Sequence, residues 1–248
     1  MAETIMEIKQ LNKYFGTKQV LAPLDLKIEK GEVVAILGPS GSGKSTLLRC
    51  LNGLETITSG ELFFKGEKLP LTDKSWQKMR TKIGMVFQSY DLFPNKTVLE
   101  NIMIGPIKVQ KRATEEVQEQ ALNWLERVGL KDRAHAYPRQ LSGGQKQRVA
   151  IVRSLCMNPE LILFDEVTAS LDPENVREVL EVILELAKTN KTLVIVTHEM
   201  AFAKQVSDRI IFMAEGKILE QGPTKAFFEQ PETERAAVFL RSLDFSNL

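Results

Sequence analysis

The stretch Gly38-Pro39-Ser40-Gly41-Ser42-Gly43-Lys44-Ser45-Thr46 decides the fold of this chain. It follows the apolar run 33–37, which is typical of a buried strand, and it precedes the segment 46–51, which is typical of a helix. Together they make the pattern G-x-x-x-x-G-K-[ST] between a strand and a helix, where backbone N–H groups can surround a phosphate. A flexible Gly/Ser-rich loop is the alternative, but such a loop requires no particular order of residues. We therefore predict that this loop binds a nucleoside triphosphate.

The residues of this loop have separate roles in holding a phosphate. The backbone N–H groups and the N-terminus of the following helix supply positive partial charge. Lys44 can reach the β- and γ-phosphates, and the Ser45 hydroxyl can ligate Mg²⁺. The candidate phosphate-binding residues are Gly38, Pro39, Ser40, Gly41, Ser42, Gly43, Lys44, Ser45 and Thr46.

Length and charge exclude several classes of function. The 248 residues carry 33 basic and 32 acidic side chains, so there is no general attraction to nucleic acid or anionic lipid. The cysteines are Cys50 and Cys156, and their apolar helical settings favour buried free thiols over a disulfide or a metal site. No stretch approaches the ~20 apolar residues that span a bilayer, and residues 1–5 do not begin a secretory leader. We expect a cytoplasmic protein, soluble by itself, that can still dock onto a membrane protein.

The apolar segments predict an α/β fold. Continuous apolar strands alternate with helices, which indicates a parallel sheet covered on both faces. The segment 24–28 alternates apolar and polar residues, as a half-exposed antiparallel strand does. The predicted strands are 5–11, 24–28, 33–37, 61–64, 83–87, 161–164, 193–196, 209–213 and 217–220, and the predicted helices of the core and tail are 173–187, 224–228 and 233–243.

Residues 97–158 are predicted to be mostly helical. Thr114 has the place of an N-cap before one helix, which Gly129 would close. Another helix should run from Ser142 to about Met157. We expect one domain over residues 1–248, in which 1–88 and 159–248 form the catalytic core with a β subdomain and 89–158 form a helical subdomain.

Two carboxylates and a histidine follow core strands. Asp165 and Glu166 come directly after the strand 161–164, and His198 follows the strand 193–196. Ligands of open α/β sheets bind beyond the carboxyl ends of the strands, so these side chains should face the phosphate-binding loop. Asp165 fits a Mg²⁺-supporting role, Glu166 a general base for water, and His198 a donor to a γ-phosphate. Taken alone, an acidic pair or a single histidine at a strand end is commonly an ordinary surface feature.

Residues 141–145, Leu-Ser-Gly-Gly-Gln, form a second candidate anion site. Ser142 and Gln145 have the S-x-x-Q spacing of a capping box at the start of a helix. Gly143 and Gly144 leave backbone N–H groups uncovered by side chains, at a helix N-terminus that favours anions. A capping box alone is weak evidence. This one stands 23 positions before Asp165 in a chain that already has a phosphate-binding loop.

With these residues in view, the sequence resembles the ATP-binding-cassette (ABC) family. Residues 38–46 match its Walker A motif, 141–145 its LSGGQ signature and 161–166 its Walker B motif. The resemblance implies a P-loop NTPase fold of the ABC ATPase type, with a RecA-like core, an antiparallel β subdomain and an inserted α-helical subdomain. It also implies ATP hydrolysis as the activity, with ATP and Mg²⁺ as cofactors.

The resemblance implies roles for single positions. Gln88 stands at the Q-loop, 170–172 at the D-loop and His198 at the H-switch. Phe15 stands where the family stacks an aromatic ring on adenine, with Tyr14 as the alternative. The implied catalytic residues are Lys44, Glu166 and His198, and the implied metal-binding residues are Ser45, Gln88 and Asp165.

The resemblance also implies partners. Two chains would meet head to tail, with each nucleotide between the P-loop of one chain and Ser142, Gly143 and Gly144 of the other, and Gln145 is also implied to bind nucleotide. ATP would close this homodimer, and hydrolysis would open it. Gln88 and the loop that follows it would transmit the change to transmembrane permease subunits, and through them to an extracytoplasmic solute-binding protein. The chain would then lie peripherally on the cytoplasmic face of the inner membrane, with no nucleic acid partner.

Within the family, the chain looks like the ATPase subunit of a polar amino acid uptake system. The resemblance lies in residues 93–101, 137–140 and 215–222 and in the tail after 227. An ABC ATPase of a mechanotransmission or lipoprotein-export complex stays open as an alternative, because its catalytic motifs would be identical. DNA-repair or chromosome-organising ATPases would need coiled coils, zinc modules or a basic surface, and translation-associated relatives would need two cassettes. Kinases and GTPases with a P-loop lack a motif like 141–145.

Overall fold

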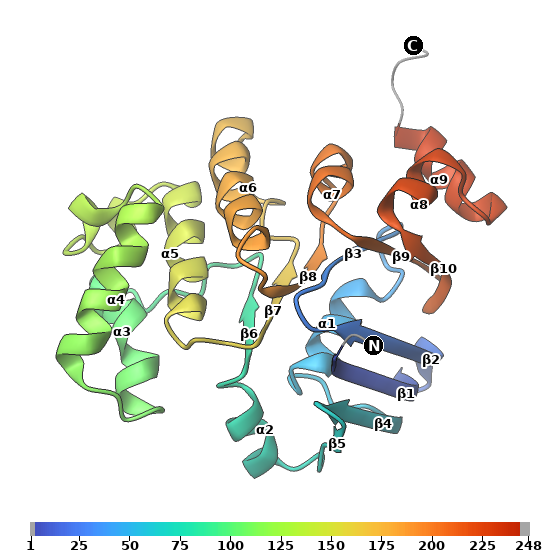
Figure 1. Cartoon of the computed structure of the whole chain (residues 1–248), viewed down its shortest axis with the longest axis horizontal. Helices are drawn as coiled ribbons and strands as arrows, with labels where there is room; N and C mark the ends of the chain where they lie inside the picture. Colours follow the sequence, from blue (N-terminus) through green and yellow to red (C-terminus); the bar gives the residue numbers. More distant parts are fainter. Residues whose placement is uncertain (1–2, 244–248) are drawn as a thin grey trace. The chain divides into compact units, whose positions relative to one another are not determined.

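The computed structural model describes residues 3–243 and divides into two compact units (Figure 1). The first unit contains the chain up to Trp76 and again from Asn190, and the second contains Gln77–Thr189. The ends of the predicted domain, 1–2 and 244–248, lie outside the described residues. The predicted boundaries of the helical subdomain, 89–158, stay a prediction.

An antiparallel sheet opens the first unit. It contains β1 (Thr4–Phe15), β2 (Lys18–Glu29), β4 (Ser59–Phe64) and β5 (Glu67–Lys68) in the order β2-β1-β4-β5. Both β1 and β2 extend beyond the predicted segments 5–11 and 24–28, because they continue to a tight hairpin in which Phe15 pairs with Lys18. The backbone N–H pairing of a hairpin depends little on side-chain polarity, so the alternation pattern misses these ends.

The second sheet segment of the first unit carries the P-loop strand. It contains β3 (Val33–Leu37), β8 (Thr192–Val196), β9 (Arg209–Ala214) and β10 (Lys217–Pro223). β3 lies between β8 and β9 and is parallel to both, whereas β10 is antiparallel to β9. Every residue of β3 and β8 is buried, as the continuous apolar runs predicted.

The helices of the first unit are α1 (Lys44–Leu51), α7 (Met200–Val206), α8 (Thr224–Glu229) and α9 (Glu234–Leu243); α2 (Asp73–Met79) begins in this unit and ends in the second. The pattern predicted α1, α8 and α9 but neither α2 nor α7, which have only seven residues each. Phe212, Phe227 and Phe239 form an aromatic cluster, with ring centroids 5.9 Å apart for Phe212–Phe227 and 5.2 Å for Phe212–Phe239. This cluster binds α8 and α9 to β9.

The second unit combines two parallel strands with four helices. The strands are β6 (Ile83–Val86) and β7 (Leu161–Asp165), and the helices are α3 (Val98–Lys108), α4 (Thr114–Arg127), α5 (Gly143–Leu155) and α6 (Pro173–Ala187). Figure 1 shows α3, α4 and α5 packed together, with α6 beside α5. Val98, Ile102, Val117, Leu125 and Val152 are fully or almost fully buried in the core that these helices share.

Helix ends in the second unit follow the predictions with one exception. Ser142 caps α5 in a capping box with Gln145, and Gly129 (φ +68) follows the end of α4. The prediction that Thr114 is an N-cap was wrong, because Thr114 is the first helical residue and Ala113 is the cap, without a side-chain hydrogen bond. Glu116, which accepts from Arg112 at 2.6 Å, stabilises this first turn in place of a hydroxyl cap.

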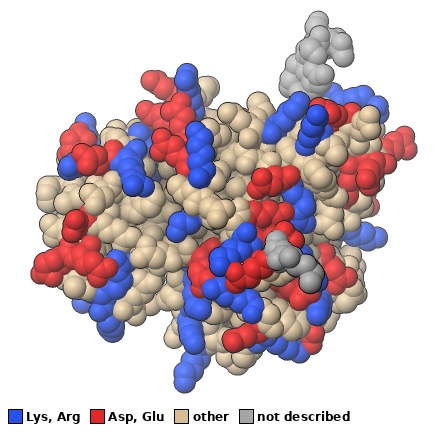
Figure 2. Space-filling model, in the orientation of Figure 1, with Lys and Arg blue, Asp and Glu red and all other residues tan. Residues whose placement is uncertain are grey.

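The surface carries mixed charge. On the face drawn in Figure 2, basic and acidic side chains are interspersed over the helices and the sheet. Among residues 3–243, no helix has the length and apolar character that crossing a membrane requires.

Candidate functional site

The loop between β3 and α1 has the geometry of a phosphate cradle. Gly38 (φ +148) and Gly43 (φ +98) both have backbone conformations that favour glycine, and Gly43 is the N-cap of α1. A Cβ at position 38 would collide with the carbonyl oxygen of Met213, and one at position 43 would lie 2.6 Å from Leu21. At Gly41 (φ +77) the space is open, so conformation alone requires glycine there. The sequence prediction of a glycine loop between a strand and a helix is confirmed.

Two polar side chains of the loop, Ser42 and Lys44, are buried. Lys44 is only 4% exposed, and its Nζ donates to the carbonyl oxygens of Gly38 and Pro39, each at 3.0 Å. Ser42 is 2% exposed, and its Oγ has no hydrogen-bond partner among residues 3–243. Buried hydroxyls are normally satisfied, so this one fits a loop that is completed by a bound anion.

His198 and the P-loop lie at the same edge of one sheet. β3 and β8 are parallel, with Ile36 opposite Val196, so both chains leave their carboxyl ends together. His198 is exposed, two residues beyond β8. Within the first unit the structure thus brings His198 to the P-loop edge, as open α/β sheets do with their ligand groups.

Phe15 ends β1 and exposes its ring. Its exposed fraction is 45%, against 38% for Tyr14, so both aromatic rings are accessible. The Nζ of Lys13 lies 4.3 Å from the centroid of the Phe15 ring, and the same ammonium group donates to the carbonyl of Thr56 at 2.7 Å. A cation on one face increases the polarity of an aromatic ring and leaves the other face available for stacking.

In the second unit, the edge formed by the carboxyl ends of the strands carries Gln88, Asp165 and Glu166. β6 and β7 are parallel, so Gln88 beyond β6 and Asp165 at the end of β7 lie at their carboxyl ends. Asp165 is 4% exposed. Glu166 has a left-handed backbone (φ +48), which is strained for a residue with a Cβ and is common at functional positions. Gln88 donates from Nε2 to Ser170 Oγ at 3.2 Å.

Residues 141–145, the signature segment, lead into α5 and pack against Tyr90 and Asn175, two side chains that the sequence pattern did not indicate. Ser142 Oγ accepts from the N–H of Gln145 at 3.2 Å, and Gln145 Oε1 accepts from the N–H of Ser142 at 3.0 Å. A Cβ at position 144 would lie 2.6 Å from the Cβ of Asn175, and one at position 143 would lie 2.9 Å from the hydroxyl oxygen of Tyr90. Close packing therefore requires glycine at position 144, whereas position 143 faces the ends of side chains.

Polar side chains of α5 hold the chain on both sides of Gln88. Gln147 is fully buried and donates to the carbonyl oxygen of Phe87 at 3.0 Å. Arg153 donates to the carbonyl oxygens of Asp91 at 2.7 Å and Tyr90 at 3.2 Å, and burial lowers the pKa of its guanidinium. For both residues, the signal in the sequence is a polar side chain among the apolar residues of a helix.

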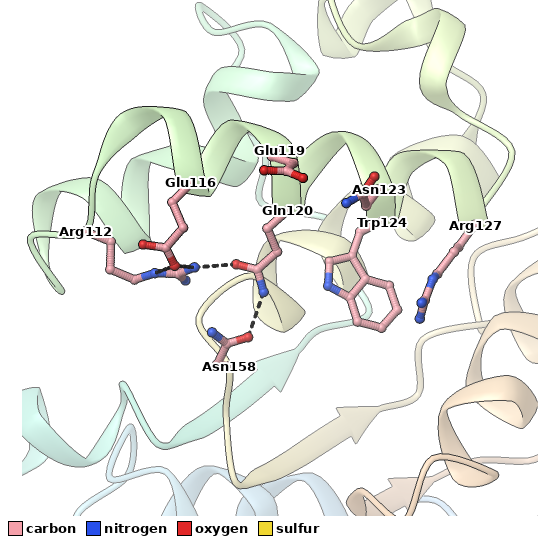
Figure 3. A pocket seen from close by; sticks show the side chains of 8 residues that line it. All are labelled: Arg112, Glu116, Glu119, Gln120, Asn123, Trp124, Arg127 and Asn158. Carbon is pink, nitrogen blue, oxygen red and sulfur yellow. Dashed lines mark hydrogen bonds and ion pairs between the residues drawn. The ribbon is translucent and has the colours of Figure 1, made fainter.

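A polar groove of about 450 Å³ lies along α4 (Figure 3). Arg112 donates to Glu116, to Gln120 and to the carbonyl oxygen of Cys156, and Gln120 donates to Asn158 at 2.7 Å. These bonds connect α4 to the chain after α5. None of the predicted site residues lines the groove, and its central polar groups bond to one another, so they serve structure.

Comparison with known proteins identifies the family. The family model described as "ABC transporter" matches residues 21–169. The chain is 54% identical to the glutamine transport ATP-binding protein GlnQ of Geobacillus stearothermophilus, over 93% of this chain and 96% of the relative. It is also 54% identical to the L-cystine import ATP-binding protein TcyC of Bacillus subtilis, over 96% of this chain and 98% of the relative.

Solved structures agree with this result. The protein cbiO1 of Clostridium perfringens, part of the ABC transporter complex cbiONQ, superposes with a TM-score of 0.83 at 31% identity, over 99% of this chain and 97% of that one. The dimeric ATP-binding cassette MJ0796, in a post-hydrolysis state bound to ADP and Pi, has a TM-score of 0.80 at 36% identity, over 89% and 99%. The P-loop geometry, the family match and these similarities agree, and the chain belongs to the ABC transporter family as an ATP-binding, ATP-hydrolysing cassette.

Proposed function

We propose that this chain powers the uptake of a polar amino acid across the cytoplasmic membrane, as the ATPase subunit of an ABC importer. The observation that carries the proposal is the 54% identity, over more than nine-tenths of the chain, to proteins named for glutamine transport and for L-cystine import. Relatives named for arginine and glutamate transport are 51% and 50% identical. The substrate class is therefore polar amino acids, and the chemistry of this chain is independent of which one is carried.

In this proposal the P-loop binds the phosphates of ATP. Its N–H groups and the N-terminus of α1 hold the anion, and Lys44 exchanges the carbonyl oxygens of Gly38 and Pro39 for phosphate oxygens. Phe15 stacks on the adenine ring. His198 donates to the γ-phosphate from the edge that it shares with the P-loop.

The proposed metal is Mg²⁺. Ser45, Gln88 and Asp165 supply a hydroxyl, an amide oxygen and a carboxylate, and Mg²⁺ prefers oxygen ligands of these kinds together with phosphate oxygens. When bound, the ion neutralises charge that develops on the phosphates. Glu166 accepts a proton from the attacking water as general base, and the strain of its backbone supports a functional position.

The second half of each site comes from a second copy. Ser142, Gly143, Gly144 and Gln145 lie at the N-terminus of α5, where the N–H groups of the two glycines would meet a partner's γ-phosphate. The dimeric cassette at TM-score 0.80 supports this arrangement. The loop after Gln88, which Arg153 holds to α5, is the proposed contact with the permease.

Two experiments test the proposal. Glu166→Gln should bind MgATP and dimerise but hydrolyse ATP ~10²- to 10⁴-fold more slowly, as loss of a general base does. Glu215→Gln is the matched control, because Glu215 is an exposed glutamate with the same left-handed backbone (φ +52). Wild-type turnover of Glu166→Gln would remove Glu166 from this role.

The transport assignment is tested by retrieval of Glu166→Gln from native membranes with MgATP. A permease together with a solute-binding protein that binds a polar amino acid is the expected result. A partner with few spans and a large external domain would instead support mechanotransmission or lipoprotein export.

A further inference from the structure

The hydroxyl of Ser142 is already hydrogen-bonded in the isolated chain. Its Oγ lies 3.2 Å from Oδ1 of Asn175, in the first turn of α6, and the hydroxyl is the donor. The same oxygen accepts from the N–H of Gln145. A hydroxyl has one hydrogen to donate, so the hydrogen that a phosphate would accept is directed at Asn175.

The orientation of the Asn175 amide is fixed by Asp172. Asn175 donates from Nδ2 to Asp172 Oδ2 at 2.6 Å, and its backbone N–H donates to Asp172 Oδ1 at 3.0 Å. These hydrogen bonds lower the pKa of Asp172, so the carboxylate is ionised at neutral pH and can only accept. The NH₂ group must therefore face Asp172, which leaves Oδ1 to face Ser142.

Packing restricts Asn175 to this position. The backbone at Gly144 is so close that a Cβ there would lie 2.6 Å from the Cβ and 2.7 Å from the Cγ of Asn175. Leu171 packs in the same way at Gly143, where a Cβ would lie 3.1 Å from its Cδ2. The N-terminus of α6 thus fits directly against the glycines of the signature segment, and Asn175 has little room to turn away.

We propose that Asn175 is a positioning residue for the signature serine, which connects the hydroxyl of Ser142 to Asp172 at the start of α6. The inference rests on the proposed function, in which Ser142 contacts the nucleotide held by a partner chain. A phosphate oxygen competes with Asn175 Oδ1 for the single hydrogen of Ser142. Engagement of Ser142 therefore changes the hydrogen bonding of the amide that also binds Asp172, so that α6 responds to nucleotide at the signature segment.

A double-mutant cycle on ATP hydrolysis tests this link. The KM for ATP and the kcat are measured for the wild type, for Asn175→Ala, for Ser142→Ala and for the double variant. Asn175→Ala removes the acceptor that competes with the phosphate for the hydrogen of Ser142, so its KM for ATP should fall about 2- to 13-fold. In the Ser142→Ala background, Asn175→Ala should change KM less than about 2-fold, because the hydroxyl that it orients is gone. Asn123→Ala, an exposed asparagine on α4, is the control and should match the wild type.

The outcomes separate the inference from the proposed function. A wild-type KM for Ser142→Ala would contradict the role of Ser142 at the nucleotide. If Ser142→Ala raises KM, and Asn175→Ala changes KM by the same factor with and without the Ser142 hydroxyl, only the positioning role of Asn175 is overturned. Thermal unfolding shows whether each variant folds. If Asn175→Ala does not fold, Asn175→Leu, which keeps the volume but has no acceptor, takes its place in the same cycle.

Discussion

The ammonium nitrogen of Lys44 lies 3.0 Å from the carbonyl oxygen of Gly38, at the opposite end of the same loop. A second bond of the same length goes to Pro39. The loop therefore holds its cation in place, almost buried, before a phosphate arrives. Because these acceptors are neutral carbonyls, phosphate oxygens can replace them with stronger, charge-assisted hydrogen bonds.

Replacement of this cation should weaken nucleotide binding. Lys44→Ala loses charge-assisted hydrogen bonds worth about 1.5–3 kcal/mol, so its Kd for MgATP should rise roughly 10- to 150-fold, measured by titration calorimetry. Lys74→Ala, at an exposed lysine of α2, should bind ATP as the wild type does. Equal affinities of Lys44→Ala and Lys74→Ala would contradict the role of Lys44.

A second prediction compares two glycines that share a backbone conformation but differ in the space around them. Gly53 (φ +64) lies against Trp76, and a Cβ there would enter the indole ring; Gly66 (φ +78) has nothing within 4 Å. Gly66→Ala should cost only the strain of the left-handed backbone, about 1–2 kcal/mol. Gly53→Ala adds overpacking and should cost about 2–5 kcal/mol of the free energy of unfolding. Urea unfolding followed by tryptophan fluorescence measures the free energy of unfolding of both variants. Equal decreases would show that the Trp76 ring moves aside without an energetic cost.

A third prediction concerns the segment 93–101, which carried much of the resemblance to amino acid importers. Asn101 is fully buried, and its amide donates to the carbonyl oxygens of Phe93, Lys96 and Thr97 and accepts from the N–H of Phe93 at 2.7 Å. Asn101→Ala removes all four of these bonds, deprives the N–H of Phe93 and the carbonyl oxygen of Lys96 of the amide as partner, and should destabilise the fold by about 2–4 kcal/mol.

Amide hydrogen exchange locates this effect. The N–H of Phe93 should exchange much faster in Asn101→Ala, because its acceptor is gone. Asn95→Ala, at an exposed position of the same loop, should stay within about 0.5 kcal/mol of the wild type. If Asn101→Ala is as stable as Asn95→Ala, the loop is held by other contacts.

Asn101 also illustrates how far the sequence determines what can be predicted. The apolar runs of β3, β7 and β8 and the stripe of α4 predicted their elements within a few residues, because burial requires continuous or periodic apolar residues. An asparagine that bonds to four backbone groups has no such pattern, since its partners depend on how a loop folds back. The same holds for α7, a seven-residue helix that tertiary packing stabilises.

The candidate site shows the same division. The P-loop and the capping box of Ser142 and Gln145 could be predicted, because each is local and its chemistry depends on residues a few positions apart. Asn175 lies 33 positions from Ser142, and only the packing of α6 on α5 brings it to the serine. The left-handed backbone of Glu166 could not be predicted either, because the presence of a carboxylate after a strand does not determine the φ angle of that residue.

The last prediction concerns the buried thiols, Cys50 and Cys156. Burial raises the pKa of each thiol from 9.0 to about 12. Both thiols are protonated in the folded chain up to high pH, whereas in the unfolded chain they ionise above about pH 9. The stability associated with these raised pKa values is therefore fully present below pH 9, and it is lost as the pH rises from about 9 towards 12. At pH 10 the loss should be about 1.4 kcal/mol for each thiol.

The measurement is the free energy of unfolding at pH 8 and pH 10 for the wild type and for a Cys50→Ala/Cys156→Ala variant. The variant is expected to be less stable at both pH values, since each substitution removes buried volume from a fully buried position. Its stability should nevertheless fall less between pH 8 and pH 10, by about 3 kcal/mol for the two thiols together. A thiol reagent should label the native wild type only at the rate of unfolding, because the reactive thiolate is absent from the folded state. Equal pH dependence in the two proteins, or rapid labelling of the native chain at pH 8, would show that these thiols ionise without unfolding.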